Sequence, residues 1–259
     1  MQLSIITATY NAELYLQRLI ESLKYQKNGI IDFEFIIIDG GSKDNTCDII
    51  KQNGTVVSYW LSEPDKGIYD AWNKGIKKAT GDWIMFLGAD DLLTEGSIEH
   101  YMETINNTSN INEYDLISSR VEMFDTNGKT IRIKGWAYEW PRFLKEMTIA
   151  HPGALHSKRL FEKYGLYDTN YKIVGDYELL LRGGKNLKTL FVDYVTVKMS
   201  EGGVSDSVKA VWEHYRAVVN TAKASPMKAR INAYIVIAKF KIKKELRKLG
   251  LNVYLKKSN

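Results

Sequence analysis

The chain has 259 residues, of which 44% are hydrophobic, 26% charged and 12% aromatic. This composition is typical of a folded globular protein and excludes collagen-like, low-complexity and wholly disordered chains. The start MQLSIITATYN lacks the pattern of a secretion signal, no apolar stretch reaches the roughly 20 residues of a membrane span, and Cys47 is the single cysteine. A reducing cytosol is therefore the expected compartment.

Charge is distributed unevenly along the chain. The net charge is +5, with 36 Lys and Arg against 31 Asp and Glu. Residues 209–259 contain 13 of the basic residues, but only Glu213 and Glu245 among the acidic ones. The rest of the chain is consequently net acidic, and the basic C-terminal segment is expected to meet an anionic partner.

Short apolar runs alternate with helical periodicity over the first 90 residues. Strands are predicted over residues 3–7, 33–38, 56–61 and 83–87, and helices over residues 12–25, 43–52 and 68–80. The second strand ends in Asp39-Gly40-Gly41-Ser42, and Ser42 is expected to cap the next helix. This alternation predicts an α/β fold, with a Rossmann-like, mostly parallel sheet and helices on both faces.

The pattern changes after about residue 110. Two predicted strands, 116–124 and 130–134, flank Asp125-Thr126-Asn127-Gly128, which is typical of a hairpin turn. A short strand at 155–156, a helix from 176 to 182 and a strand at 189–199 follow, and residues from 208 onward are helical to about 249, with an interruption at Ser225-Pro226. We therefore predict a domain of residues 1–207 with a small antiparallel addition, and a basic helical extension of residues 208–259.

Acidic residues follow three of the predicted parallel strands, where ligands of open α/β sheets bind. Asp39 follows the second strand, Glu63-Pro64-Asp65 the third, and Asp90-Asp91 the fourth. No glycine follows the first strand, so an NAD-type phosphate loop is missing. Carboxylates in this position can hold Mg²⁺ or Mn²⁺ together with a substrate phosphate, or they can simply form the turns.

Four segments carry a family resemblance: SIITATYN, IIIDGGSKDNT, EPDKGIYDAWNKGIKKATGDWIMFLGADD and GDYELLLR. In this order and spacing they resemble family 2 glycosyltransferases of the GT-A fold, particularly bacterial exopolysaccharide and O-antigen enzymes, over about residues 1–205. The resemblance implies an inverting, metal-dependent enzyme. Such an enzyme transfers a sugar from a nucleotide-sugar, usually a UDP-sugar, to a hydroxyl group of a saccharide acceptor, which in relatives is often lipid-linked.

The resemblance assigns residues of the first two strand ends to the nucleotide. Thr9 and Asn11 would line it, and Asp39 would hydrogen-bond its base. Asp39 also suits the role of a carboxylate at a helix start, beside the Gly-Gly turn, and the two roles are compatible.

By the same resemblance, Lys66, Asp70 and Asn73 lie in the segment that closes over the base, ribose or phosphates. Asp70 and Asn73 are three residues apart on one predicted helix face, so both are expected to reach one ligand. For Lys66, a solvated helix surface is the alternative.

The GADD segment departs from the commoner D-x-D-D pattern of the family because Gly88 replaces the first carboxylate. Asp90 and Asp91 still occupy the positions that bind Mn²⁺ or Mg²⁺ in relatives, and Asp90 is also expected to contact the donor. Trp72 stands where relatives often have Met or Arg. Both departures weaken the assignment of UDP more than the assignment of a transferase.

GDYELLLR places Asp176 at the position of the general base, which takes the proton from the attacking acceptor hydroxyl. Gly175 stands where relatives have an acid. The alternative for Asp176 is a helix cap, and Glu178 and Arg182 are expected to form an ion pair. His151, in a segment that resembles the acceptor-side loop, is expected either to contact the acceptor or diphosphate or to be a hydrogen-bonded structural histidine.

Two later segments have predicted roles of their own. Gly202-Gly203-Val204-Ser205 suggests a flexible lid over the donor. Residues 229–249 mix aliphatic and aromatic residues with Lys and Arg, which is typical of a helix at an anionic membrane surface. Such binding would place the protein at the inner face of the cell membrane, whereas the alternative is a helix packed on the body with a solvated basic face.

Three other functions share some of these sequence features. A nucleic-acid-binding protein would fit the basic extension, but the acidic body and the lack of a recognition motif argue against a nucleic-acid partner. A sugar nucleotidyltransferase shares strand-end acids but needs a Gly-rich basic phosphate loop, which the sequence lacks. A non-catalytic nucleotide-sugar-binding protein would bind donor without turnover.

Overall fold

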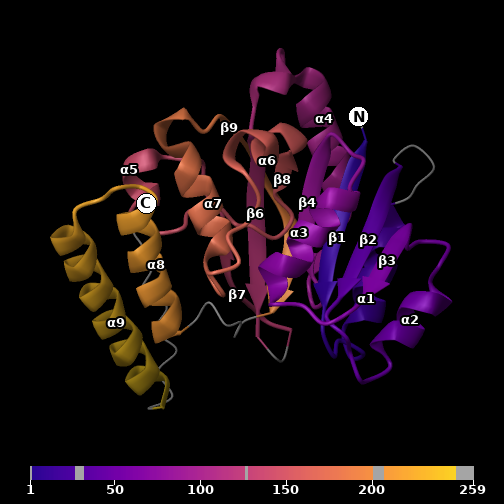
Figure 1. The fold of residues 1–259 in the computed structure, drawn as a ribbon, viewed down its shortest axis with the longest axis horizontal. Coiled ribbons are helices and arrows are strands. Elements are labelled where there is room, and N and C mark those ends of the chain that lie inside the picture. Colours follow the sequence, from indigo (N-terminus) through magenta and orange to yellow (C-terminus); the bar gives the residue numbers. More distant parts are fainter. Residues whose placement is uncertain (1, 27–31, 126–127, 201–206, 249–259) are drawn as a thin grey trace.

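The computed structural model describes residues 2–26, 32–125, 128–200 and 207–248. Within them, one mixed sheet runs through the molecule with helices on both faces, and two further helices lie beside it near the C-terminus (Figure 1). The segment predicted to form a lid, residues 202–205, and the last eleven residues of the predicted extension lie outside the described residues.

The sheet has the strand order β3-β2-β1-β4-β8-β6-β9-β5, with β7 paired to β6. Its parallel half consists of β1 (Leu3–Thr9), β2 (Phe33–Asp39), β3 (Tyr59–Ser62) and β4 (Trp83–Gly88). The other strands are β5 (Leu92–Leu93), β6 (Leu116–Phe124), β7 (Thr130–Lys134), β8 (Leu155–Ser157) and β9 (Thr189–Ser200). Because β2 and β4 lie on opposite sides of β1, the order in which strands are added across the sheet reverses at β1. In open α/β sheets, ligands bind beyond the carboxyl ends of the strands at such a point.

Each strand contributes to a core on each face because successive side chains alternate. Ile6 of β1 lies in one core with α3 (Ile68–Lys78), α6 (Lys158–Tyr164) and α7 (Gly175–Gly183). Ile5 lies in the other core. The helices of this second face are α1 (Leu16–Gln26), α2 (Thr46–Gln52) and α4 (Ser97–Asn107).

Most predicted strands are confirmed, including both strands of the hairpin. The third strand starts at Tyr59 rather than residue 56, because the N–H groups of Val56 and Val57 both bond to the carbonyl of Asn53 in a turn. The prediction that Ser42 caps a helix is wrong. Helix α2 begins at Thr46, and the Ser42 hydroxyl bonds to Asp39 instead.

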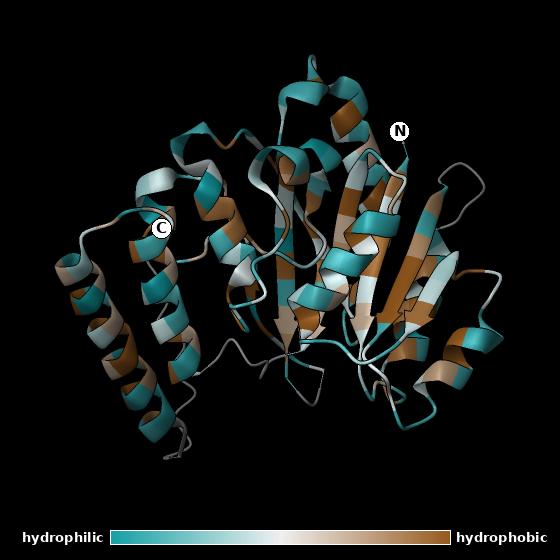
Figure 2. Ribbon diagram, in the orientation of Figure 1, coloured by the Kyte–Doolittle hydropathy of each residue, from teal (hydrophilic) through white to brown (hydrophobic). Residues whose placement is uncertain are grey.

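The extension forms two helices, α8 (Val208–Asn220) and α9 (Pro226–Lys248), next to the short α5 (Trp140–Phe143) and α7. Ala217 and Val218 of α8 are buried in the same core as α3 and α7. In α9, apolar and polar residues intermingle along the whole length (Figure 2). Within the described part of the chain, no helix is long and apolar enough to cross a membrane.

Candidate active site

Asp39 closes β2 and organises the loops around it. Its carboxylate accepts hydrogen bonds from the hydroxyls of Thr9 (2.9 Å) and Ser62 (2.6 Å), from the backbone N–H groups of Gly41 and Ser42, and from the Ser42 hydroxyl. Burial alone would raise the pKa of Asp39, but these hydrogen bonds outweigh it and hold the pKa below its ordinary value. Hydrogen-bond donors of the chain itself thus occupy this ionised carboxylate. A hydrogen bond to the base of a nucleotide would require one of these donors to turn away.

Thr9 and Asn11 follow β1 on the same edge. Thr9 is buried and donates to Asp39, so its side chain supports the loop. Asn11 has a positive φ of 48°, its backbone N–H donates to the Ser42 hydroxyl (2.8 Å), and its side-chain oxygen accepts from the Lys43 backbone (2.9 Å). The structure therefore brings these three predicted nucleotide residues together at the carboxyl ends of β1 and β2.

The predicted residues of α3 separate into two groups. Asp70 accepts from the backbone N–H of Lys66 (3.1 Å) and lies 3.7 Å from the ammonium of Lys74, near the exposed side of the helix. Asn73 is buried, and its amide bonds to both the carbonyl (2.8 Å) and the N–H (3.0 Å) of Tyr167. Asn73 therefore holds α3 to the segment before α7, whereas Asp70 is engaged near the exposed side of the helix, and a ligand shared by the two residues stays a prediction.

Asp90 and Asp91 follow β4, with Asp90 exposed and Asp91 buried. The Asp91 carboxylate accepts from the Gly88 N–H (2.7 Å), and burial together with the Asp90 charge raises the pKa of Asp91 to about 7. A Cβ at position 88 would lie 2.9 Å from Asp90 Oδ1 and 3.1 Å from Asp91 Oδ2. Gly88, which departs from the family pattern, thus leaves room for the carboxylates of Asp90 and Asp91 to lie against the backbone at position 88.

Asp176 lies in the first turn of α7, where the N-terminal end of a helix favours a negative charge. The Tyr69 hydroxyl lies 3.1 Å from its Oδ1 and 2.9 Å from the Ile173 carbonyl. Burial raises the pKa of Asp176 to about 6, although the Tyr177 N–H and the Tyr69 hydroxyl act in the opposite direction. Asp176 is consequently mostly ionised at neutral pH and close to its titration.

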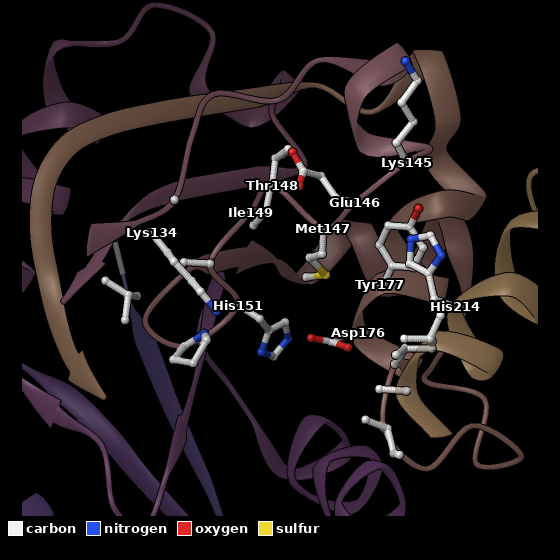
Figure 3. Close-up of a pocket in the computed structure, with 18 of the residues that line it drawn as sticks. Lys134, Lys145, Glu146, Met147, Thr148, Ile149, His151, Asp176, Tyr177 and His214 are labelled. Atoms are coloured by element: carbon white, nitrogen blue, oxygen red, sulfur yellow. The ribbon is translucent and has the colours of Figure 1, made fainter. Parts of the chain in front are cut away.

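A cavity of about 510 Å³ opens next to Asp176, and Figure 3 shows the carboxylate pointing into it. Its walls come from α3, the segment 134–152, the start of α7 and helices α8 and α9. Most lining residues are aliphatic or aromatic, among them Trp72, Trp136, Met147, Val174 and Val236. An apolar enclosure with a few polar groups is typical of small-molecule sites.

His151 lines this cavity, and its contact with an acceptor or diphosphate stays a prediction. Its ring stacks on Trp72 with centroids 4.9 Å apart, and its Nε2 lies 3.0 Å from the Tyr167 hydroxyl. Burial lowers the pKa of His151 to about 3, so the ring is neutral at pH 7. Contact with a diphosphate would therefore rest on a hydrogen bond and not on charge.

Several residues of the site had no assigned role in the sequence. Tyr69 and Trp72 share the buried face of α3, and their spacing of three residues indicated a common face, but not a position beside Asp176. His214 and Glu213 belong to α8, far from every family motif in sequence. The predicted ion pair of Glu178 and Arg182 is confirmed, with Arg182 Nε 3.1 Å from both carboxylate oxygens.

The sequence profile of glycosyl transferase family 2 matches residues 4–165. A PGL/p-HBAD biosynthesis glycosyltransferase of Mycobacterium bovis (strain BCG / Pasteur 1173P2) is 32% identical over 214 residues, which cover 79% of this chain and 79% of the relative. An uncharacterized glycosyltransferase of Mycobacterium tuberculosis (strain ATCC 25618 / H37Rv) is 30% identical over 206 residues, covering 78% and 76%.

Two solved structures share the fold. S. aureus TarS 1-349 in complex with UDP-GlcNAc matches with a TM-score of 0.65 at 18% identity, over 90% of this chain and 70% of TarS. The mannosyltransferase PcManGT from Pyrobaculum calidifontis, in complex with GDP-Man and Mn²⁺, matches with a TM-score of 0.64 at 14% identity, over 89% and 67%. The predicted GT-A fold is confirmed, and the profile match and the sequence relatives show that this chain belongs to glycosyl transferase family 2.

Proposed function

We propose that this glycosyltransferase is inverting and moves a sugar from a UDP-sugar to a hydroxyl group of a lipid-linked saccharide acceptor, in the biosynthesis of a bacterial surface polysaccharide. The observation that carries the proposal is the position of Asp176. Its carboxylate faces an apolar cavity large enough for a ligand, at the start of a helix, and burial brings its pKa to about 6.

In this mechanism Asp176 accepts the proton of the acceptor hydroxyl while that oxygen attacks the anomeric carbon. The bond from the sugar to the diphosphate breaks as the new bond forms on the opposite face, which inverts the centre without a covalent enzyme intermediate. A base is most effective when its pKa lies just below the working pH, so that it is ionised and still basic. Tyr69 holds the carboxylate in place through its hydroxyl.

Asp90 and Asp91 would hold a divalent cation, Mn²⁺ or Mg²⁺. Their fit rests on two neighbouring carboxylates, one exposed and one buried, whose mutual repulsion a cation would relieve. Oxygen ligands of this kind suit hard divalent cations. When bound, such a cation supplies charge neutralisation for a leaving diphosphate.

The nature of donor and acceptor rests on similarity. TarS in its solved complex holds UDP-GlcNAc and PcManGT holds GDP-Man, so a nucleotide-sugar is the donor class and a UDP-sugar the first candidate. The mycobacterial relative is named for PGL/p-HBAD biosynthesis. An acceptor attached to an apolar group agrees with the apolar cavity beside Asp176.

Helix α9 supports a membrane-bound acceptor. Five of its six exposed large apolar residues form a row with helical spacing, all except Val236: Met227, Ile231, Tyr234, Ile235 and Ile242. The helix also carries eight Lys and Arg residues against one acidic residue. Apolar residues flanked by cations match a surface of anionic lipid, and we assign this face of α9 to the inner leaflet of the cell membrane.

The membrane assignment is tested by flotation with vesicles of phosphatidylglycerol and phosphatidylethanolamine. Met227→Glu, Ile231→Glu and Ile242→Glu together should abolish flotation, because they place charge in the apolar row. The control variant carries Leu14→Glu and Tyr25→Glu, which alter exposed apolar residues away from α9 (75% and 86% exposed). Equal flotation of all three proteins would overturn the assignment.

The enzymatic proposal is tested by a donor screen. Purified protein is supplied with UDP-, GDP- and dTDP-sugars, with lipid-linked saccharide acceptors, and with Mn²⁺, Mg²⁺ or a chelator. The expected result is release of nucleoside diphosphate from a UDP-sugar that needs both acceptor and cation, with an inverted linkage in the product. Pyrophosphate release would instead identify a nucleotidyltransferase, and donor binding without turnover a binding protein.

A further inference from the structure

The part of the cavity that faces away from the sheet is built by the C-terminal helices. Ala210, Val211 and His214 of α8 and Asn232, Ala233 and Val236 of α9 line it. These six residues lie beyond residue 165, where the family profile ends. The wall that they form therefore lies outside the part of the chain that the profile matches.

This wall is largely apolar. Val211, Ala233 and Val236 line the cavity together with Met147 and Val174. A sugar ring alone presents hydroxyl groups on most sides, and leaving them against aliphatic side chains costs the hydrogen bonds that water provided. The geometry thus fits a ligand with a polar part near Asp176 and an apolar part between α8, α9 and Met147.

Three residues that line this cavity each have a buried side-chain atom with no hydrogen-bond partner among the described residues: Trp72 Nε1, Thr148 Oγ1 and His214 Nε2. They come from three separate segments, and each atom destabilises the protein while it stays unsatisfied. Side-chain rotations on binding are common, so these groups can turn to a ligand seated beside them. Three such groups around one cavity fit a ligand that brings several hydroxyl groups.

His214 is the polar group that α8 contributes. Its ring stacks on the ring of Tyr177, the residue that follows Asp176 in the sequence. The ring centroids are 4.5 Å apart, and the angle between the ring planes is 13°. The Tyr177 hydroxyl is itself engaged, since it donates to the Phe143 carbonyl (2.6 Å). Burial lowers the pKa of His214 to about 4, so the neutral ring offers one donor and one acceptor nitrogen at pH 7.

We propose that α8 and α9 form an acceptor subsite for a glycoside with an apolar aglycone, in which the aglycone packs on Val211, Ala233 and Val236 and His214 hydrogen-bonds a sugar hydroxyl. This inference rests on the proposed function, since it treats the cavity beside Asp176 as the acceptor site. It goes further by making the C-terminal helices, and His214 among their residues, part of acceptor recognition.

The test measures binding by calorimetry in the presence of UDP. The probes are phenyl and octyl glycosides of glucose, galactose, mannose, rhamnose and N-acetylglucosamine, each compared with its free sugar. At least one glycoside is expected to bind about tenfold or more tightly than its free sugar, from the burial of a few methylene groups. His214→Phe, which preserves the ring stack, should weaken that glycoside about tenfold through one lost hydrogen bond.

Matched variants separate the subsite from general damage. His100→Phe changes a histidine that also contacts an aromatic ring, Tyr194 at 3.9 Å, but lies outside the cavity, and it should bind like the wild type. Val236→Trp fills the apolar end and should abolish the preference for the aglycone, whereas Ile235→Trp on the exposed side of α9 should not. This pair keeps the test decisive if His214→Phe fails to fold.

The subsite is overturned if free sugars bind as tightly as the glycosides, if no glycoside binds, or if both cavity variants bind like the wild type. The affinity for UDP, measured in the same titrations, distinguishes this failure from that of the proposed function. A wild type that does not bind UDP would contradict the proposed UDP-sugar donor, whereas UDP binding without glycoside binding would remove the subsite alone.

Discussion

The hydroxyl of Tyr69 lies 3.1 Å from Oδ1 of Asp176, which links the third helix of the parallel half to the first turn of α7. The same hydroxyl lies 2.9 Å from the Ile173 carbonyl, so its one proton is shared between two acceptors. A carboxylate held in this manner has a fixed direction toward the cavity. Residues separated by more than one hundred positions in sequence therefore set the geometry of the expected base.

The pH dependence of turnover should follow the ionisation of Asp176. A base acts only when unprotonated, so activity should fall as the pH drops through its pKa of about 6. We expect kcat/KM at pH 5 to be about one tenth of its plateau value. Donor binding measured over the same range serves as the control, and an acidic limb near pH 4, the ordinary carboxyl range, would contradict the assignment.

Tyr69→Phe removes the hydroxyl that lowers the pKa of Asp176 and fixes its direction. The acidic limb of the pH profile should then move to higher pH, and kcat at neutral pH should fall about tenfold with little change in the donor KM. Tyr25→Phe, at a position 86% exposed on α1, is the matched control. A Tyr69→Phe enzyme with an unchanged profile would show that this hydroxyl has no influence on the base.

Gly175 has a physical reason to replace the acid of the family motif. A Cβ at this position would lie 2.8 to 2.9 Å from ring atoms of Tyr69. Gly175→Ala should therefore push the ring away from Asp176, lower kcat and reduce the free energy of unfolding by about 1–3 kcal/mol, as overpacking does. Gly54→Ala, where the nearest atom is 3.6 Å away, should leave kcat unchanged, and equal activity of both variants would exclude the effect.

Glu213 of α8 holds the segment that leads into α7. Its carboxylate accepts from the backbone N–H groups of Lys172 (3.0 Å), Ile173 (2.9 Å) and Val174 (3.2 Å). Glu213→Ala should lower kcat about tenfold and shift the acidic limb of the pH profile. The reason is that the Ile173 carbonyl and the Asp176 carboxylate would no longer be aligned with the Tyr69 hydroxyl. Glu213→Gln, which keeps an acceptor oxygen, should restore part of kcat.

The control for this positioning role is Glu99→Ala, at an exposed residue of α4. A purely structural role for Glu213 would lower the melting temperature of Glu213→Ala without moving the pH profile. That outcome would contradict the positioning role, whereas a moved profile with partial recovery in Glu213→Gln would support it.

Much of the fold was predictable because buried parallel strands leave a strong local pattern. The runs that form β1 and β2 are rich in apolar, mostly β-branched or aromatic residues, the run that forms β4 is apolar throughout, and both strands of the β6–β7 hairpin were predicted with their observed bounds. Helix α6, with seven residues, is too short to show a period. Ser42 was misassigned because its hydroxyl bonds to a carboxylate three residues back, which competes with capping.

The candidate site was predictable where it follows strand ends and family motifs, and less so elsewhere. Asp39, Asp90 and Asp91 lie where the topology requires, at the carboxyl ends of β2 and β4. Asn73 bonds to Tyr167, a partner that helical spacing cannot reveal. His214 joins the cavity through the packing of α8 on α7, a tertiary contact between distant segments that leaves no local signal in the sequence.

The central claim is that Asp176 is the base of a glycosyl transfer, and Asp176→Asn tests it most directly. The substitution keeps the size of the side chain and an acceptor for the Tyr69 hydroxyl, but it cannot take up a proton at neutral pH. We predict that kcat falls about 100-fold or more while the donor binds as tightly as in the wild type. Turnover above about one tenth of the wild-type rate would contradict the account.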